Sequence, residues 1–186
     1  MEKLKQLDEK LFLYLNNSGS EFWDSFWLII TDQWMSIPIY ALLSLLILRK
    51  TGFKSALVSG VMILVLVGTT LVISRLVKYG VARPRPCTLE HLNMRLPLGE
   101  DCGDFGFFSS HSSVGLALMV FIGFLLKPFY KYIFWPLLIW VGLFGLSRIY
   151  VAKHYPGDII VGFLVGFILA VIFHKIRQWI YRKYHL

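Results

Sequence analysis

Residues 55–74 read SALVSGVMILVLVGTTLVIS, a run of twenty residues that contains no charged side chain. Because an α-helix rises 1.5 Å per residue, such a run covers about 30 Å, the thickness of the hydrocarbon core of a bilayer. The whole chain shares this character: 56% of its 186 residues are hydrophobic, 16% are charged, and the mean hydropathy is +0.63. Too few polar groups remain to cover a soluble protein. The run therefore predicts a membrane-spanning helix.

Four further apolar stretches lie on both sides of this run. They cover residues 33–48, 109–126, 132–147 and 157–173. Several are shorter than the usual twenty residues, so any one of them also fits a buried helix of a soluble all-α protein. Five such stretches in a chain of this size leave no polar shell for that class of protein. We therefore expect an all-α integral membrane bundle of about five transmembrane helices, forming one membrane domain over residues 1–186.

The first 17 residues have a different pattern. Acidic residues are frequent among them, and no long apolar core precedes a small-residue cleavage site, so the segment does not resemble a secretory signal peptide. Its apolar side chains recur at helical spacing, at Leu4, Leu7, Leu11, Tyr14 and Leu15. This pattern is typical of an amphipathic helix that lies along a membrane surface. We expect residues 1–17 to form such an interfacial helix.

The charges of the loops predict an orientation. The net charge is +8, but the basic residues are separated by apolar runs, which argues against nucleic acid as a partner. Basic clusters occupy residues 49–54, 127–131 and 175–183, which share one side of the membrane if the spans alternate. Short basic loops stay in the cytoplasm, so residues 75–111 and 148–158 face outward. We expect an integral protein of the bacterial inner membrane with a site facing the periplasm or exterior.

Both cysteines of the chain, Cys87 and Cys102, lie in the outward segment. In an oxidising compartment they could form a disulfide that restricts the unfolded chain by about 3 kcal/mol. Two free thiols are the alternative, because a sequence does not show whether two Cα atoms lie within reach of each other.

Ionisable residues gather at the outward ends of the predicted spans. They are Arg75, Lys78, Arg83, Arg85, His111, Arg148, His154 and Asp158. Such residues are costly near lipid unless they face a polar cavity, so each is a candidate functional residue. Lys and Arg near helix ends also serve as interfacial anchors, the role that we expect for Arg75, Arg95 and Lys153. Anchoring explains neither the histidines nor the carboxylate of the set.

The clustered cations predict that an anion binds between them, since positive groups held together repel one another. Phosphate fits, because the Arg fork matches its oxygens and Lys adds a point charge. Ser109 or Ser110 can cap the helix that follows, which directs free backbone N–H groups and the positive end of the helix dipole at the same anion. The expected site is a phosphate cradle without a metal or other cofactor.

Phosphate binding alone does not require His111, His154 and Asp158. Pro156 is expected to start the last helix, which places Asp158 in its first turn. A carboxylate there can accept a hydrogen bond from one imidazole nitrogen of His154 and leave the other free to attack. His111, from a different helix, could protonate the leaving oxygen. The pattern favours catalysis by a nucleophilic histidine.

These residues resemble the signature of the type 2 phosphatidic acid phosphatase (PAP2) superfamily, whose motifs are K-x6-R-P, P-S-G-H and S-R-x5-H-x3-D. The first motif is intact over residues 78–86 (KYGVARPRP) and the third over residues 147–158 (SRIYVAKHYPGD). The second departs from the pattern, with Phe108 in place of proline and Ser110 in place of glycine. The resemblance covers residues 55–175, which form the expected phosphatase core.

The resemblance implies a helical bundle with its active site at the outer membrane face, and metal-independent hydrolysis of amphiphilic phosphates through a phosphohistidine. His154 would attack phosphorus, Asp158 would orient it, and His111 would protonate the leaving group and later activate water. Arg83 lies outside the signature but could join the phosphate site. The phosphate-binding residues that the resemblance implies are Lys78, Arg85, Arg148 and Ser109, with the neighbouring N–H groups at Ser110.

Soluble vanadium-dependent haloperoxidases are similar to this family at the site, because vanadate mimics phosphate. The five apolar stretches argue against that class for this chain. We nevertheless expect vanadate to act as an inhibitor.

The expected partners are membrane lipids and a lipid phosphate substrate, with undecaprenyl diphosphate as the leading candidate. Lipid A phosphates, phosphatidylglycerol phosphate and phosphatidic acid are rivals, because an apolar surface does not distinguish one acyl chain from another. A phosphate or lipid transporter is an alternative that predicts polar residues continuing toward the cytoplasmic half of the spans. A catalytically inactive lipid-phosphate binder is a further alternative, motivated by the altered second motif.

Overall fold

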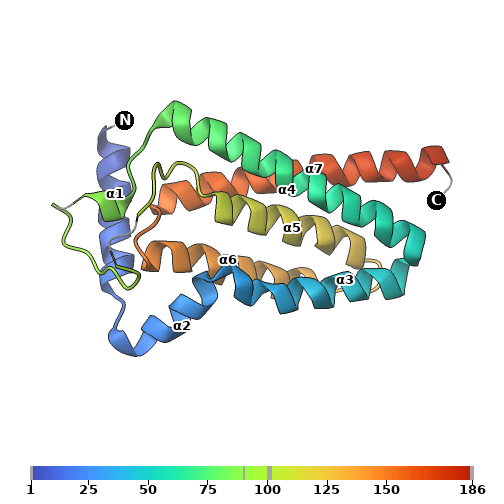
Figure 1. The fold of residues 1–186 in the computed structure, drawn as a ribbon, viewed down its shortest axis with the longest axis horizontal. Helices are drawn as coiled ribbons and strands as arrows, with labels where there is room; N and C mark the ends of the chain where they lie inside the picture. The colour runs from blue at the N-terminus through green and yellow to red at the C-terminus, as the bar shows by residue number, and fades with distance from the viewer. Residues whose placement is uncertain (1, 90, 100–101, 185–186) are drawn as a thin grey trace.

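The computed structural model describes residues 2–89, 91–99 and 102–184, and over these residues every regular element is a helix. Figure 1 shows α3 to α7 running along an elongated bundle, with α1 lying across one end. The elements are α1 (Glu2–Asn17), α2 (Glu21–Thr31), η1 (Gln33–Ser36), α3 (Ile37–Thr51), α4 (Phe53–Val81), η2 (Pro86–Thr88), α5 (Ser110–Leu126), α6 (Phe134–Tyr150) and α7 (Pro156–Tyr184). The expected all-α architecture is confirmed.

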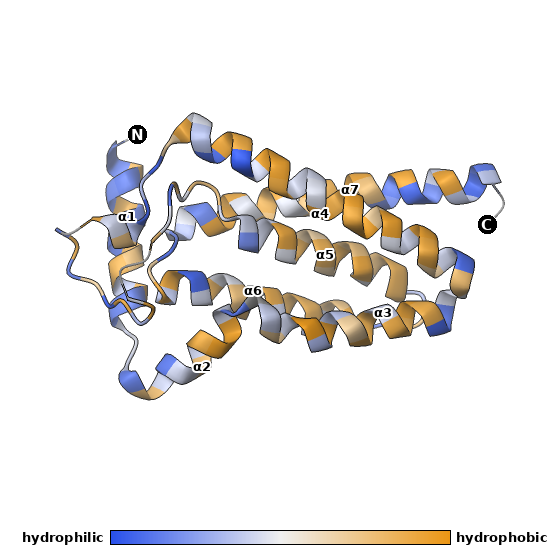
Figure 2. Cartoon of the chain, viewed as in Figure 1, coloured by the Kyte–Doolittle hydropathy of each residue, from blue (hydrophilic) through white to orange (hydrophobic). Residues whose placement is uncertain are grey.

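Three segments are long and apolar enough to cross a membrane, namely Trp34–Thr51, Phe53–Thr88 and Pro156–Tyr184. The helices α5 and α6 are apolar but have 17 residues each, which corresponds to about 26 Å. Figure 2 shows hydrophobic residues along the middle of the bundle and hydrophilic residues gathered toward its two ends. This distribution is typical of a helical bundle that spans a bilayer.

The short helix α5 lies at the centre of the bundle, packed against α4, α6 and α7. Twelve of its seventeen residues are buried, as expected of a helix that is apolar on every side. Gly162 and Gly166 of α7 face its first turn: a Cβ added at Gly162 would lie 2.7 Å from the carbonyl oxygen of Ser109, and one at Gly166 would meet that of Ser113. Small residues four apart allow this close approach, which brings the start of α7 against the start of α5.

The helix predicted over residues 1–17 is present as α1, and its two faces differ. Leu4, Leu7 and Tyr14 are between 62% and 74% exposed, whereas Phe12 is fully buried and packs edge-to-face on Tyr155 with 5.5 Å between ring centroids. The exposed apolar face suits a membrane surface. The buried face adds a second role that the sequence did not indicate, because it packs on the loop that precedes α7.

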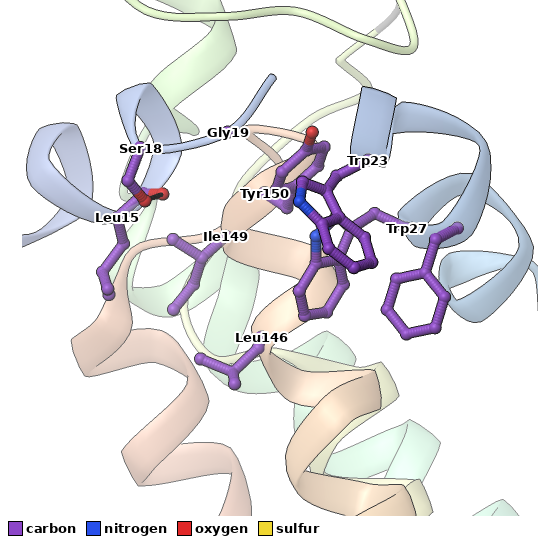
Figure 3. A pocket seen from close by; sticks show the side chains of 9 residues that line it. Leu15, Ser18, Gly19, Trp23, Trp27, Leu146, Ile149 and Tyr150 are labelled. Atoms are coloured by element: carbon purple, nitrogen blue, oxygen red, sulfur yellow. Dashed lines mark hydrogen bonds between the residues drawn. The ribbon is translucent and has the colours of Figure 1, made fainter. Parts of the chain in front are cut away.

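Two features lie beyond the predicted spans. The helix α2 was not expected; it packs against α6, where Trp27 stacks on Tyr150 with 5.3 Å between ring centroids. Figure 3 shows Trp23, Trp27 and Tyr150 around an apolar pocket of about 500 Å³ between these helices. Between α4 and α5, Cys87 and Cys102 are paired as a disulfide with their Cα atoms 5.9 Å apart.

Candidate active site

The motif residues meet at the end of the bundle that α1 covers. Lys78 is in the last turn of α4, His111 in the first turn of α5 and Arg148 in the last turn of α6. Asp158 is in the first turn of α7, which begins at Pro156 as predicted. The loop between α6 and α7 carries His154, so four helix ends and one loop converge on a single region.

His154 and Asp158 form a pair that is shielded from solvent, with side chains 1% and 0% exposed. His154 Nδ1 lies 3.5 Å from Asp158 Oδ2 and has no hydrogen-bond partner. The same Oδ2 accepts a hydrogen bond of 3.0 Å from the backbone N–H of Tyr155. The carboxylate is therefore on the Nδ1 side of the imidazole, at a separation slightly longer than a hydrogen bond, as is common for catalytic pairs without substrate.

Burial lowers the pKa of His154 well below its ordinary value, and the charges of Arg148, Arg85 and Lys78 lower it further. The backbone of Gly106 opposes this effect and raises the pKa. At neutral pH the imidazole is therefore uncharged, which is the state in which a ring nitrogen carries a lone pair for nucleophilic attack.

Three cations surround the histidines. Lys78, Arg85 and Arg148 all lie within electrostatic range of both His111 and His154. Arg148 Nη1 donates a hydrogen bond of 2.6 Å to Thr31 Oγ1 of α2, while its Nε is buried without a partner. A buried donor without a partner is costly, and an anion bound beside it would remove that cost.

Two of these three cations line a cavity of about 380 Å³ that adjoins an apolar groove of about 290 Å³. Lys78 and Arg85 belong to the cavity, His111 belongs to the groove, and Leu71 and Ser110 line both. The groove is lined by residues of α3, α4, α5 and α6. An amphiphile with a phosphate at one end and an acyl chain at the other fits this arrangement.

Ser109 and Ser110 have different positions at the start of α5. Ser109, one of the two serines expected as the N-cap, has that position, and its Oγ accepts a hydrogen bond of 3.3 Å from the N–H of Ser112. It is fully buried, and its N–H donates to the carbonyl oxygen of Asp158 at 3.1 Å. Ser109 therefore ties α5 to α7, and Ser110 is the serine on the cavity wall.

The serine at position 110 does not disturb the turn. Among the described residues other than glycine, only Ala82 and Ala152 have a positive φ. Ser110 begins α5 with a backbone that any residue adopts. The glycine of the usual second motif is therefore not needed for the backbone conformation of this chain.

Arg83 forms two ion pairs that the sequence did not indicate. Its Nη1 donates to Asp158 Oδ1 at 2.8 Å and its Nη2 to Asp8 Oδ2 at 2.8 Å. Its guanidinium also lies 3.9 Å from the centroid of the Tyr155 ring. With both terminal nitrogens bonded to carboxylates, Arg83 links α1 to Asp158.

Sequence reasoning missed Asp8 because α1 was assigned to the membrane surface as a whole. The signal that could have identified it is the position of this polar residue on a helix face between apolar residues, at helical spacing.

Arg95 and Arg75, two of the residues expected to be anchors, have further contacts within the protein. Arg95 Nη2 forms an ion pair of 3.0 Å with Asp24, and its Nη1 donates to the hydroxyl of Tyr150 at 3.0 Å. Arg95 therefore connects the segment between α4 and α5 to α2 and α6. Arg75 lines the cationic cavity, and the backbone carbonyl of Lys153 accepts a hydrogen bond of 3.4 Å from Arg85.

Comparison with known proteins identifies relatives over most of the chain. The chain is 29% identical over 174 residues to a lipid A 4'-phosphatase of Bacteroides thetaiotaomicron, a match that covers 89% of this chain and 75% of that protein. A lipid A 4'-phosphatase of Porphyromonas gingivalis is 29% identical over 95% of this chain and 75% of that protein. The undecaprenyl-diphosphatase BcrC of Bacillus subtilis is 31% identical over 105 residues, 56% of this chain and 51% of that protein.

Two crystal structures share the fold. LpxE of Aquifex aeolicus superposes with a TM-score of 0.70 at 22% identity, covering 89% of this chain and 93% of that one. A transmembrane PAP2-type phosphatidylglycerolphosphate phosphatase of Bacillus subtilis superposes with a TM-score of 0.76 at 17% identity, covering 97% and 89%. The apolar helices and these neighbours together establish an integral membrane protein. A sequence model of the PAP2 superfamily matches residues 56–182, well over half of the chain, and the chain accordingly belongs to the PAP2 superfamily.

Proposed function

We propose that this lipid phosphatase of the PAP2 type transfers phosphate from its substrate to His154 and then to water, without a metal, at the outer face of the membrane. One observation carries the proposal. His154, buried beside Asp158, lies within electrostatic range of three cations, two of which line a cavity that adjoins an apolar groove. Such a site can hold phosphate, supply a neutral nucleophile and accept a lipid tail.

In the first step, Nε2 of His154 attacks phosphorus, and the bond between phosphorus and the ester oxygen breaks. His111 gives a proton to that oxygen, so the lipid alcohol leaves neutral. Asp158, on the Nδ1 side of the ring, stabilises the positive charge that the imidazole gains. Lys78, Arg85 and Arg148 stabilise the charge on the phosphoryl oxygens in the transition state.

In the second step, His111, now unprotonated, takes a proton from a water molecule as that water attacks the phosphohistidine. The bond between phosphorus and nitrogen breaks, inorganic phosphate forms, and His154 returns to its neutral state. Because the three cations supply the positive charge that metal ions supply in many phosphatases, the scheme has no metal-dependent step.

A lipid A phosphate is the substrate that we now favour. Two relatives that match 89% and 95% of this chain are lipid A 4'-phosphatases. Undecaprenyl diphosphate, the leading candidate from sequence, is the second choice, because the relative that acts on it matches 56% of the chain. Both substrates place an anionic phosphate beside long apolar chains, which agrees with the adjoining cavity and groove.

The proposed orientation, in the bacterial inner membrane, places the site at the periplasm or exterior. Basic residues gather at the opposite end of the bundle, which is the end expected in the cytoplasm. The disulfide between Cys87 and Cys102 lies on the site side, where an oxidising compartment would allow it to form.

The transporter alternative receives no support from the described helices. In α5, the residues from Val114 to Leu126 are apolar or glycine. In α7, no charged residue occurs between Asp158 and His174. A translocation path would require polar groups through this central region.

Phosphate release by the detergent-purified protein in excess EDTA tests the function. The panel contains lipid A phosphate, undecaprenyl diphosphate, phosphatidylglycerol phosphate and phosphatidic acid. We expect release that survives EDTA, is blocked by vanadate and disappears in His154→Ala, whereas His91→Ala, at an exposed histidine of the outward segment, retains it. Loss of activity in EDTA would overturn the metal-free mechanism, and a wild-type protein silent on every lipid would favour the inactive binder.

A further inference from the structure

One carboxylate outside the signature motifs reaches the His154–Asp158 pair. Asp8 of α1 bonds to Arg83, and Arg83 bonds to Asp158, with 2.8 Å in each contact. The Arg83 side chain is 19% exposed and that of Asp8 15% exposed, so both contacts are largely shielded from water. The ion pairs therefore form a line of three charged groups from α1 to the catalytic pair.

Asp8 makes a second contact at the same place. Its Oδ1 accepts a hydrogen bond of 2.7 Å from the backbone N–H of Gly157, in the first turn of α7. A Cβ added at Gly157 would lie 2.8 Å from Asp8 Oδ2, so glycine is the residue that allows this approach. An anionic side chain at a helix N-terminus is favourable. Asp8 thus holds the turn that contains Asp158 as well as the arginine bonded to it.

Contacts outside the ion pairs fix α1 over the site. Phe12, one turn after Asp8, is buried against Tyr155. Asn16, a further turn along, is fully buried and donates to the carbonyl oxygen of Tyr150 at 2.8 Å. The face of α1 that carries these three side chains is therefore docked along its length, and Asp8 has a defined position relative to α7.

The charge of Asp8 has a direct consequence for Asp158. Arg83 alone would neutralise the Asp158 carboxylate and weaken its stabilisation of a positive imidazole. Asp8 offsets the charge of Arg83, so the three groups together keep one net negative charge beside His154. Arg83 can then fix the carboxylate through Oδ1 while Oδ2 remains turned to the imidazole.

We propose that Asp8 is a positioning residue for the reaction, which acts through Arg83 and the first turn of α7 to hold Asp158 against His154 Nδ1. The inference rests on the proposed function of the site. It assigns α1 a part in the chemical step in addition to its contact with the membrane surface.

The test is Asp8→Asn in the full chain, assayed on the best lipid of the panel. We expect kcat to fall about tenfold, equal to about 1.4 kcal/mol in the barrier, while KM stays within twofold because the phosphate ligands are untouched. Asp8→Glu restores the charge and should recover part of kcat. Glu2→Gln is the matched control, since it removes a negative charge from the same helix at an exposed position.

Asn16→Ala distinguishes two roles of Asp8, namely positioning Asp158 and only anchoring α1 to the bundle. It removes hydrogen bonds to Tyr150 and Arg95 but leaves the three charged groups intact. We expect it to lower Tm in detergent while kcat changes less than in Asp8→Asn. Equal losses of kcat at equal losses of Tm would overturn the proposal, because they would show that Asp8 only anchors the helix.

A double-mutant cycle with Arg83→Gln tests the route. If Asp8 acts through Arg83, then Asp8→Asn adds little to the loss caused by Arg83→Gln, so the two effects are strongly non-additive. Fully multiplicative effects would overturn the proposed route. If Asp8→Asn has the kcat of the wild type while His154→Ala is inactive, this inference alone is refuted. If phosphate release is sensitive to EDTA, or if His154→Ala is active, the function on which the inference rests is refuted.

Discussion

Asp158 approaches His154 from the Nδ1 side, with 3.5 Å between Oδ2 and the ring nitrogen, while its other oxygen is bonded to Arg83. The two residues are four positions apart, but the loop that carries His154 and the helix that starts at Pro156 turn them toward each other. The Asp158 carboxylate is therefore held by protein contacts before substrate binds, whereas His154 Nδ1 has no hydrogen-bond partner.

We predict that Asp158→Asn lowers kcat at least a hundredfold with a smaller change in KM. The amide keeps the shape of the side chain but loses the charge that stabilises a positive imidazole, and in a histidine–aspartate pair of this kind the charge matters mainly in the transition state. Initial rates over a range of substrate concentrations separate the two parameters. An unchanged kcat would exclude a role for Asp158 in the chemical step.

The pH dependence follows from the lowered pKa of His154. Protonation removes the nucleophile, so the acid limb of kcat/KM is expected below pH 6.5, the ordinary value for histidine. The substrate phosphate also titrates near pH 6. Its ionisation is measured by phosphorus NMR, and the pH profile of kcat/KM is corrected for it. An acid limb above pH 6.5 after that correction would contradict the assignment of His154 as a neutral nucleophile.

The same shift affects stability in a defined direction. The unfolded chain binds a proton at His154 near pH 6.5, whereas the folded protein binds it only at lower pH. Stability is therefore fully present above pH 6.5 and falls as pH drops from there toward the lower pKa of the folded state. Thermal unfolding of wild type and His154→Ala between pH 4 and pH 8 measures this contribution.

The cation cluster should be a source of instability in the empty protein. We predict that Lys78→Met lowers kcat/KM at least a hundredfold and raises Tm by about 2 °C, because it removes repulsion with Arg85 and Arg148 together with a desolvated charge. Vanadate should raise the Tm of the wild type and have a smaller effect on the variant, since it binds the cluster. A lower Tm in Lys78→Met would show that the lysine is satisfied within the protein.

Much of this arrangement could be predicted from the sequence. Apolar runs locate α3 to α7, because a lipid-facing helix must be apolar over most of its length. Motif spacing brings Lys78, Arg85, Arg148, His154 and Asp158 together, because the residues at helix ends on one side of the membrane must meet there. Pro156 as the start of the last helix was also correct, and the N-cap of α5 was narrowed to two serines, of which Ser109 has that position, since both features follow from local backbone chemistry.

The parts that could not be predicted depend on packing between distant segments. The ion pair between Arg83 and Asp8 was not foreseen, because Asp8 lies 75 positions away in the sequence on a helix that was assigned to the membrane surface. Arg95 looked like an anchor because its partner Asp24 lies on α2, whose alternation of acidic and aromatic residues gave no clear span. A carboxylate that neutralises an arginine becomes visible only when the two segments are placed in space.

The apolar groove beside His111 predicts a size limit for the lipid tail. Val67 lines the groove from α4, and Val67→Trp would fill part of its volume of about 290 Å³. We expect this variant to raise KM for long-chain lipid phosphates about tenfold while leaving a short water-soluble phosphate ester unaffected. Leu64→Trp is the matched control, since Leu64 is 73% exposed on the same helix and does not line the groove. If Val67→Trp changes KM equally for both substrates, the lipid tail does not bind in this groove. A tail that binds there makes KM sensitive to the added tryptophan only for the substrate with the long tail.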